Sequence, residues 1–266
     1  MKATIIINTN NQNAFLTRVI LSALNQKYSD YEVIISNLSK IKDTNIEKKF
    51  KFNKKIKFLN LNEKFLYPTQ NQLYSIKEAL KYSRGRYIFL LDGDDFFKKN
   101  KINTIIKLIN NKDKLLIDKP IIFDEITKIN QKKMRVNNLK KNAFYKFLIN
   151  DWPSITCTSG ITVEKKIIKK FFKEINPFKY KHLAIDIQLA AFVNSRFNIK
   201  YLDKDLTFKS QNNKNLDKTY SNIFSKKFWI RRNEQHNFFI HEIKKKKIFK
   251  GFDFYIVKII NFFIKS

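Results

Sequence analysis

The stretch SRGRYIFLLDGDD, residues 83–95, predicts a buried strand that ends in a cluster of carboxylates. Residues 86–91, RYIFLL, have the length of one strand and are apolar after Arg86, and the acidic turn Asp92-Gly93-Asp94-Asp95 follows directly. In an open sheet flanked by helices, ligands bind beyond the carboxyl ends of the strands. The acidic turn is therefore the first candidate for a functional site.

Carboxylates as close in sequence as those of the acidic turn repel one another unless a cation neutralises them. Mg²⁺ and Mn²⁺ prefer carboxylate oxygens and can bridge a diphosphate group, and Gly93 allows the backbone to approach a ligand closely. The turn therefore predicts a divalent metal at Asp94 and Asp95 together with a bound diphosphate. An exposed acidic turn that begins the next helix would contain the same residues.

The sequence before the acidic turn alternates between strand and helix patterns. Apolar runs predict strands over residues 4–8, 31–35 and 56–61. One helix is predicted from helical spacing of apolar residues, and a second from a capping-box pair and the apolar stripe after it. The residues are Leu16, Val19, Ile20, Ala23 and Leu24 in the first helix, and Thr69, Gln72, Leu73, Ile76 and Leu80 in the second, which we expect Gly85 to end. The alternation predicts an α/β fold with a mostly parallel sheet flanked by helices.

The pattern after residue 120 is less regular, and no repeat or linker interrupts it. It predicts a hairpin, two short strands and several helices. The ranges are 121–126 with 133–136 around a turn at 129–131 for the hairpin, 199–202 and 206–208 for the strands, and 142–150, 164–172, 182–193 and 218–266 with a break at Gly251 for the helices. We therefore expect one domain over residues 1–215 and a helical C-terminal extension over residues 216–266.

The composition limits the class of partner. The chain has 266 residues and a net charge of +31, but only seven of its 54 basic residues are arginine, the residue suited to read phosphates and bases. Because the lysines are also scattered, a nucleic-acid partner is disfavoured, whereas an anionic ligand or membrane surface needs only a positive potential. The single Cys157 excludes an intrachain disulfide and indicates a reducing compartment. With no signal-like start and no apolar stretch long enough to span a bilayer, we expect a cytoplasmic protein.

Residues 4–36, TIIINTNNQNAFLTRVILSALNQKYSDYEVIIS, together with residues 83–95 resemble the amino-terminal half of family 2 glycosyltransferases. The matching positions are Ser22, Gln26, Tyr28, Gly85, Tyr87, Ile88, Leu91, Asp92, Asp94 and Asp95. The resemblance implies a Rossmann-like GT-A fold, a nucleoside-diphosphate sugar donor, Mg²⁺ or Mn²⁺, and inversion at the anomeric carbon.

The same resemblance implies roles for individual residues. Thr9 would lie against the nucleotide base, Asp94 and Asp95 would hold the ribose and the metal, and Asp92 would shape the turn. The division of roles among these aspartates stays open. Where the family often has an aspartate after the second strand, this chain has Asn37, which can donate as well as accept, so the identity of the base is open too.

The second half must supply a proton acceptor, because an inverting transfer is a single displacement. Asp186 is similar in position to the aspartate of the family's Glu-Asp motif, with Ile185 in place of the glutamate. Its apolar neighbours are expected to raise its pKa, although a structural aspartate at a helix start would look the same. Arg231 or Arg232 would hold the leaving diphosphate, although a charged helix face would contain the same residues.

The C-terminal stretch has four lysines at 244–247 and then an amphipathic pattern. Its apolar positions are Phe252, Tyr255, Ile256, Ile259, Ile260 and Phe263. The pattern predicts a helix that either lies in an anionic membrane surface on the inner face or packs on the domain. Overall we expect a glycosyltransferase for a glycan or lipid-linked acceptor in cell-surface polysaccharide synthesis. The alternatives are a catalytically weak sugar-nucleotide-binding protein of GT-A fold and, less favoured, a basic nucleic-acid-binding protein.

Overall fold

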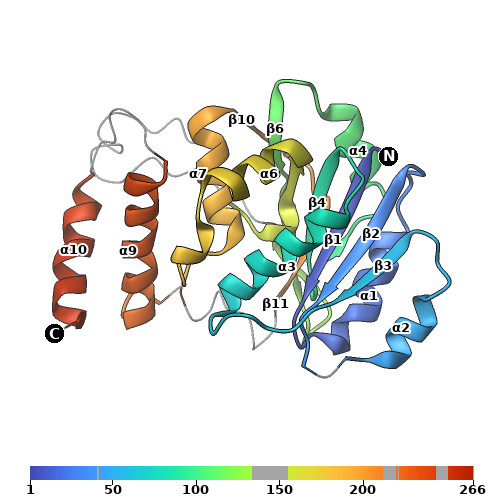
Figure 1. The fold of residues 1–266 in the computed structure, drawn as a ribbon, viewed down its shortest axis with the longest axis horizontal. Coiled ribbons are helices and arrows are strands. Elements are labelled where there is room, and N and C mark those ends of the chain that lie inside the picture. Colours follow the sequence, from blue (N-terminus) through green and yellow to red (C-terminus); the bar gives the residue numbers. More distant parts are fainter. Residues whose placement is uncertain (41, 134–154, 212–219, 221, 244–250, 266) are drawn as a thin grey trace.

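A computed structural model describes residues 1–40, 42–133, 155–211, 220, 222–243 and 251–265, and its centre is a seven-stranded sheet. The strand order is β10-β6-β9-β4-β1-β2-β3. The strands are β1 Ala3–Thr9, β2 Tyr31–Asn37, β3 Ile56–Asn60, β4 Tyr87–Asp92, β6 Asp113–Ile117, β9 Ile161–Glu164 and β10 Asn198–Tyr201. Only β9 runs antiparallel to its neighbours in this sheet. The predicted mixed, mostly parallel α/β sheet is confirmed (Figure 1).

Helices cover both faces of the sheet (Figure 1). On one face pack α3 Pro68–Tyr82, α6 Lys165–Glu174 and α7 Ile185–Arg196, and on the other pack α1 Asn13–Leu24, α2 Thr44–Phe50 and α4 Lys101–Leu108. In β4, for example, Ile88 and Leu90 belong to the first core and Phe89 and Leu91 to the second. Because both faces are buried at the centre of the sheet, β1, β2 and β4 are nearly continuous apolar runs, which is why the sequence identified them, whereas β6 and β9 were not predicted.

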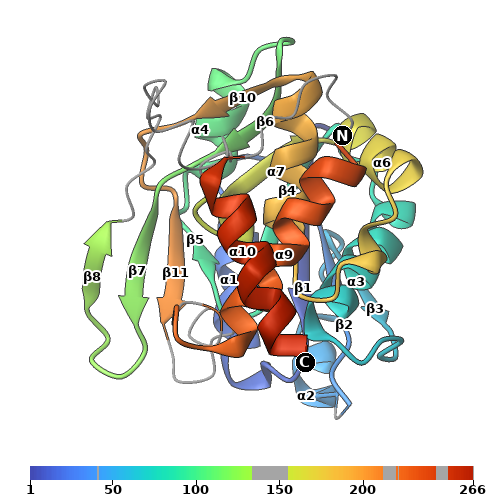
Figure 2. The ribbon, with the colours of Figure 1, turned by 90° about the vertical axis from the view of Figure 1, so that its left-hand side faces the viewer.

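A second sheet of four strands has the order β5-β11-β7-β8 (Figure 2). Its strands are β5 Phe96–Phe97, β7 Pro120–Asp124, β8 Asn130–Lys133 and β11 Thr207–Gln211. β7 and β8 form the expected hairpin, but its turn lies at residues 125–129, earlier than expected. The reason is local, since Asp124 accepts hydrogen bonds from the N–H groups of Ile126 and Thr127, and Lys128 adopts a φ of 58°. Residues 134–136 and the helix expected at 142–150 lie outside the described residues.

Two details of α3 differ from the sequence prediction. The helix begins at Pro68, and the Thr69 hydroxyl donates to the carbonyl of Lys181 instead of capping the helix. Gly85 does not end the helix, whose last residue is Tyr82. A side chain at Gly85 would come within 2.4 Å of the Ala3 backbone, so a close contact with β1 is what requires this glycine. The helix predicted from residue 182 also begins later, at Ile185.

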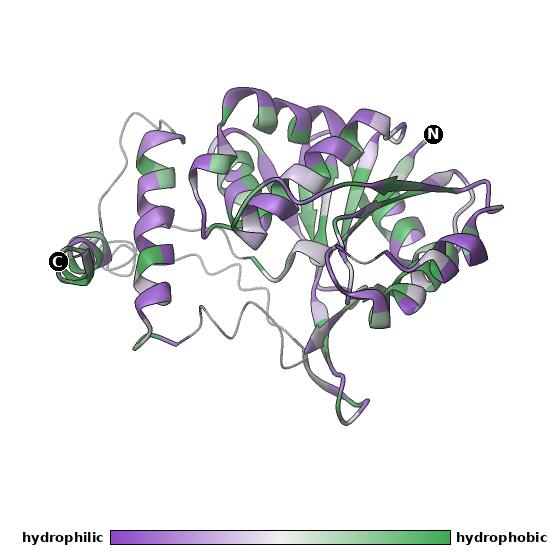
Figure 3. Ribbon diagram, turned by 60° about the horizontal axis from the view of Figure 1, so that its bottom comes forward, coloured by the Kyte–Doolittle hydropathy of each residue, from purple (hydrophilic) through white to green (hydrophobic). Residues whose placement is uncertain are grey.

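Two helices follow the second sheet, α9 Lys226–His241 and α10 Phe252–Lys265. Phe238 of α9 is buried against the ring of Tyr180, at a centroid distance of 5.1 Å, and belongs to the core on the α7 side. α10 packs on α9 and lies on the side of α9 away from the sheet (Figures 1 and 3). Within the described part of the chain, no helix is both long and apolar enough to cross a membrane.

Candidate active site

Three of the predicted site residues meet at the carboxyl edge of the main sheet. β1 lies between β2 and β4, and the strand register pairs Thr9 with Asn37 and Asn8 with Asp92. Each predicted residue therefore ends its strand at the same level. Parallel pairing of neighbouring strands is what brings residues far apart in sequence to one edge.

Gly93 and Thr9 form a close contact under the acidic turn. A Cβ atom at Gly93 would lie 2.6 Å from the Thr9 Oγ1 and 2.5 Å from the Gln12 Oε1, so only glycine fits there. The Thr9 side chain is buried, and its hydroxyl has no hydrogen-bond partner among the described residues. An unpaired buried hydroxyl costs about 1–3 kcal/mol, so this position is suited to a ligand that restores the hydrogen bond.

Asn37 is buried at the end of β2, where the family often has an aspartate. Its Oδ1 accepts a hydrogen bond from the backbone N–H of Ser39 at 2.9 Å. The oxygen keeps a second lone pair, and the NH₂ group is a donor that can contact a ligand. Asn37 therefore has the chemistry of a donor to a carbonyl oxygen, such as one on a nucleotide base.

The acidic turn carries unfavourable electrostatic energy. Burial, the charge of Asp94 and the charge of Asp186 raise the pKa of Asp92 to about 7, against a hydrogen bond of 3.0 Å from the Gln72 Nε2. Burial, followed by the charges of Asp94 and Asp92, also raises the pKa of Asp95. A bound cation would relieve this repulsion, so the donor set fits a divalent metal.

Among the described residues, no group of three or more His, Cys, Asp or Glu side chains could hold a metal unaided. This agrees with how Mg²⁺ binds in phosphate-transfer sites, where one or two carboxylates and the substrate phosphates share the coordination. Asp94 is half-buried, whereas Asp95 is only 4% exposed and its Oδ1 accepts a hydrogen bond of 2.8 Å from the Ser210 N–H. The two predicted metal ligands thus have different surroundings.

The buried ion pair of Lys101 and Asp118 is connected to the acidic turn through Ser159. The N–H of Asp92 donates to the Ser159 Oγ at 2.9 Å, and the carbonyl of Ser159 accepts from the Lys101 Nζ at 2.7 Å. Lys101 is fully buried and pairs with the equally buried Asp118 at 2.6 Å. Sequence reasoning missed Lys101, Asp118 and Ser210, because nothing in their local sequence indicates that they lie near residues 92–95.

Asp186 is brought to the same site from the second half of the chain. It is the second residue of α7, it is half-buried, and its Oδ1 accepts from the Ile187 N–H at 2.7 Å. Its charge contributes to the raised pKa of Asp92, so the two carboxylates lie close enough to interact. The fold therefore brings the acidic turn and the helix-start aspartate within electrostatic range of each other.

The two arginines predicted to hold a diphosphate lie on α9. The Arg232 Nη2 donates to the Asp253 Oδ2 of α10 at 2.9 Å, and the Arg231 guanidinium lies over the Tyr220 ring at 5.0 Å. These contacts are made to α10 and to Tyr220. Arg231 lies near the segment that precedes Asp186. The pKa of His182 in that segment is lowered mainly by burial, then by the charges of two lysines, and then by the charge of Arg231.

Residues 4–172 match the sequence model of the family described as Glycosyl transferase family 2. No curated protein sequence matches the chain significantly. The structure is similar to S. aureus TarS 1–349 in complex with UDP-GlcNAc, at a TM-score of 0.67 and 16% identity, with 92% of this chain and 68% of that chain covered. It is also similar to the mannosyltransferase PcManGT from Pyrobaculum calidifontis in complex with GDP-Man and Mn²⁺, at 0.63 and 10%, with 97% and 68% covered.

A longer S. aureus TarS structure aligns at a TM-score of 0.59 and 17% identity over 79% of this chain. The present chain spans only 37% of that protein. At such identities the likeness shows a shared GT-A fold, and activity must be argued from the site.

Proposed function

Because this chain belongs to glycosyl transferase family 2, we propose that it transfers a sugar from a nucleoside-diphosphate donor to a hydroxyl group of a glycan or lipid-linked acceptor. The observation that supports the proposal is the electrostatic interaction of Asp186, at the start of α7, with Asp92 of the acidic turn at the carboxyl edge of the sheet. The complexes of TarS with UDP-GlcNAc and of PcManGT with GDP-Man and Mn²⁺ support this class of donor.

On the donor side, Thr9 and Asn37 contact the nucleotide, and the carboxylates of Asp92 and Asp94 lie against the ribose and the diphosphate. Asp94 is the proposed direct ligand of Mg²⁺ or Mn²⁺. Asp95, the second predicted metal ligand, holds the turn through the Ser210 N–H. When bound, the metal would neutralise the negative charge that develops on the departing nucleoside diphosphate. Of the two arginines, Arg231 is the better candidate to contact the diphosphate, because Arg232 pairs with Asp253.

On the acceptor side, Asp186 accepts the proton of the attacking hydroxyl. In a single displacement the hydroxyl oxygen attacks the anomeric carbon while the bond to the diphosphate breaks, so the configuration is inverted. The acidic turn is committed to the donor, and Asp186 is the carboxylate supplied by the other half of the site.

The outer face of α10 supports peripheral membrane binding, as the amphipathic sequence suggests. Val257 and Asn261 are buried against α9, whereas six large apolar side chains point outward. These exposed residues, the α10 stripe, are Phe252, Tyr255, Ile256, Ile259, Phe262 and Phe263. An apolar stripe on a protein of net charge +31 suits an anionic membrane on its inner face, and therefore a lipid-linked acceptor in polysaccharide synthesis. The lysines at 244–247 lie outside the described residues.

A melting-temperature screen of nucleoside diphosphates with and without Mn²⁺ tests the donor assignment. We expect one of UDP and GDP to raise the melting temperature, and to do so far more with Mn²⁺, because ligands that bind only the native state stabilise it. Release of the labelled sugar from the matching nucleotide sugar then measures turnover. Binding without turnover would favour a sugar-nucleotide-binding protein, and no binding by any nucleoside diphosphate would contradict the proposal.

A further inference from the structure

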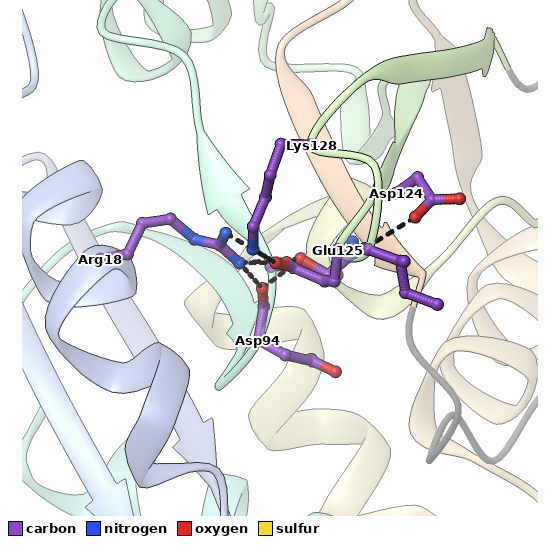
Figure 4. A network of polar contacts seen from close by, with 8 residues as sticks. Arg18, Asp94, Asp124, Glu125 and Lys128 are labelled. Atoms are coloured by element: carbon purple, nitrogen blue, oxygen red, sulfur yellow. Dashed lines mark hydrogen bonds and ion pairs between the residues drawn. The ribbon is translucent and has the colours of Figure 1, made fainter.

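Arg18 of α1 contacts the backbone of the acidic turn. Its Nη2 donates to the carbonyl oxygen of Asp94 at 3.0 Å and to the Ser210 Oγ at 3.1 Å. Both terminal nitrogens also donate to the carboxylate of Glu125, in the turn of the β7–β8 hairpin. Figure 4 shows Arg18 reaching from α1 toward Glu125 and the Asp94 backbone. One guanidinium thus connects α1, the acidic turn and the second sheet.

The position of Arg18 is fixed from several sides. Its guanidinium carbon lies 4.5 Å from the ring centre of Phe96 and 5.4 Å from that of Phe123. The Glu125 side chain is only 6% exposed and also accepts from the Lys128 Nζ at 2.9 Å. Burial alone would raise the pKa of Glu125, but hydrogen bonds from Arg18, Ser210 and Lys128 outweigh burial and hold the pKa at about 2. The pair therefore stays charged at neutral pH.

These contacts converge on a single peptide group. The carbonyl of Asp94 accepts from Arg18 and from the Ser210 Oγ, while the Ser210 N–H holds the carboxylate of Asp95. The peptide between the two aspartates is thus held on both sides, and the backbone of a residue sets the direction of its side chain. Only a guanidinium has the planar fork that can bind Glu125 with two nitrogens and reach the carbonyl as well.

We propose that Arg18, held by Glu125, is a positioning residue that fixes the Asp94–Asp95 peptide and so aims the Asp94 carboxylate at the metal and diphosphate. This inference rests on the proposed function. Arg18 contacts no reacting atom itself. Its effect is expected in the affinity for the metal–nucleotide complex, because small displacements of a binding group weaken binding steeply.

Electron paramagnetic resonance titration of Mn²⁺, with UDP and separately with GDP, tests the proposal on R18Q and R18K. The matched control is R84Q, because Arg84 pairs with Glu32 at 2.8 Å at the opposite end of β4. Both glutamine variants lose one arginine–glutamate pair. We expect R18Q to weaken Mn²⁺–nucleotide binding about tenfold, R18K to recover only part of it, and R84Q to bind like the wild type.

A double-mutant cycle tests the pairing with Glu125. E125Q should weaken binding nearly as much as R18Q, and R18Q/E125Q should weaken it no further, because each variant loses the same Arg18–Glu125 interaction. If the wild type binds Mn²⁺–nucleotide and R18Q binds it as tightly as R84Q does, the positioning role of Arg18 is contradicted while the proposed function stands. If the wild type binds neither nucleotide, both the proposed function and the positioning role of Arg18 are contradicted.

Discussion

Asp186 and the acidic turn have separate roles, which single substitutions can distinguish. Asp186→Asn keeps the size of the side chain and its hydrogen bond to the Ile187 N–H, but it removes the proton acceptor. Loss of a general base typically lowers the rate about 10²–10⁴-fold. We therefore expect turnover to collapse while Mn²⁺–nucleotide affinity stays within about twofold of the wild-type value, as measured by calorimetric titration.

Asp203→Asn serves as the control for Asp186→Asn, because Asp203 is exposed and pairs with Lys119 at the surface. Near-normal turnover of the Asp186 variant would exclude it as the base. A joint loss of affinity and melting temperature would assign it a structural role at the start of α7.

The two carboxylates at the end of the acidic turn should respond differently to loss of charge. Asp94→Asn removes the proposed metal ligand, so we expect Mn²⁺-dependent nucleotide binding to weaken at least about tenfold, which is a loss of about 1.4 kcal/mol. Asp95→Asn still offers an oxygen to the Ser210 N–H and removes a buried charge, so binding should change much less. Calorimetric titration of both variants decides between them, and a larger loss with Asp95→Asn would make Asp95 the metal ligand.

At the scale of elements, α10 is the helix whose two faces can be tested separately. The double variant Phe262→Glu/Phe263→Glu changes two side chains that are each 72% exposed. We expect it to leave the melting temperature unchanged and to abolish sedimentation with anionic vesicles, because two carboxylates cannot enter the membrane interface. Vesicle pelleting and thermal unfolding measure the two effects.

A matched control for the α10 stripe is Phe52→Glu/Leu66→Glu, which makes the same charge change at residues 88% and 87% exposed and far from α10 in sequence. It should still bind vesicles. If both double variants lose binding equally, the general positive charge and not the α10 stripe explains it. If the α10 variant pellets as the wild type does, the membrane proposal for this helix is wrong.

At the scale of the whole molecule, the Arg18–Glu125 pair joins α1, which packs on the main sheet, to the β7–β8 hairpin of the second sheet, and its contribution to stability should depend on pH. The pKa of Glu125 falls from 4.5 to about 2 in the folded state, where hydrogen bonds from Arg18, Ser210 and Lys128 outweigh the effect of burial. A carboxylate with a lowered folded-state pKa stabilises the fold above its unfolded pKa, and this stabilisation is lost as pH falls through the folded value.

We therefore expect the difference in unfolding free energy between wild type and E125Q to be constant above about pH 5. It should shrink as the pH falls from about 5 to about 2, because the unfolded state binds the proton in this range whereas the folded state does not bind it until about pH 2. Urea unfolding at several pH values measures this difference. A difference that stays constant down to pH 2 would contradict the lowered pKa.

The sequence by itself predicted five of the seven strands of the main sheet and the acidic turn, but not β6, β9, α2 or α4. Both faces of the main sheet are buried, so its strands became continuous apolar runs, and the helix stripes at 3.6-residue spacing identified α1 and α3. The acidic turn was identified because its carboxylates are adjacent along the chain. The apolar face of α10 was also predicted in most of its positions, since amphipathic spacing is a local property, but whether that face is exposed was left open.

Only the tertiary structure decided which residues meet. Asp186 and Asp92 interact, Thr69 bonds to Lys181 instead of capping α3, and Arg18 binds Glu125 and the acidic turn, although no local pattern joins any of these pairs. The tertiary structure also gave Asp95 different surroundings from Asp94, because the buried carboxylate of Asp95 accepts a hydrogen bond from the Ser210 N–H. The physical reason is that hydrophobic spacing reports which face of an element is buried, whereas strand order and the packing of loops set its neighbours.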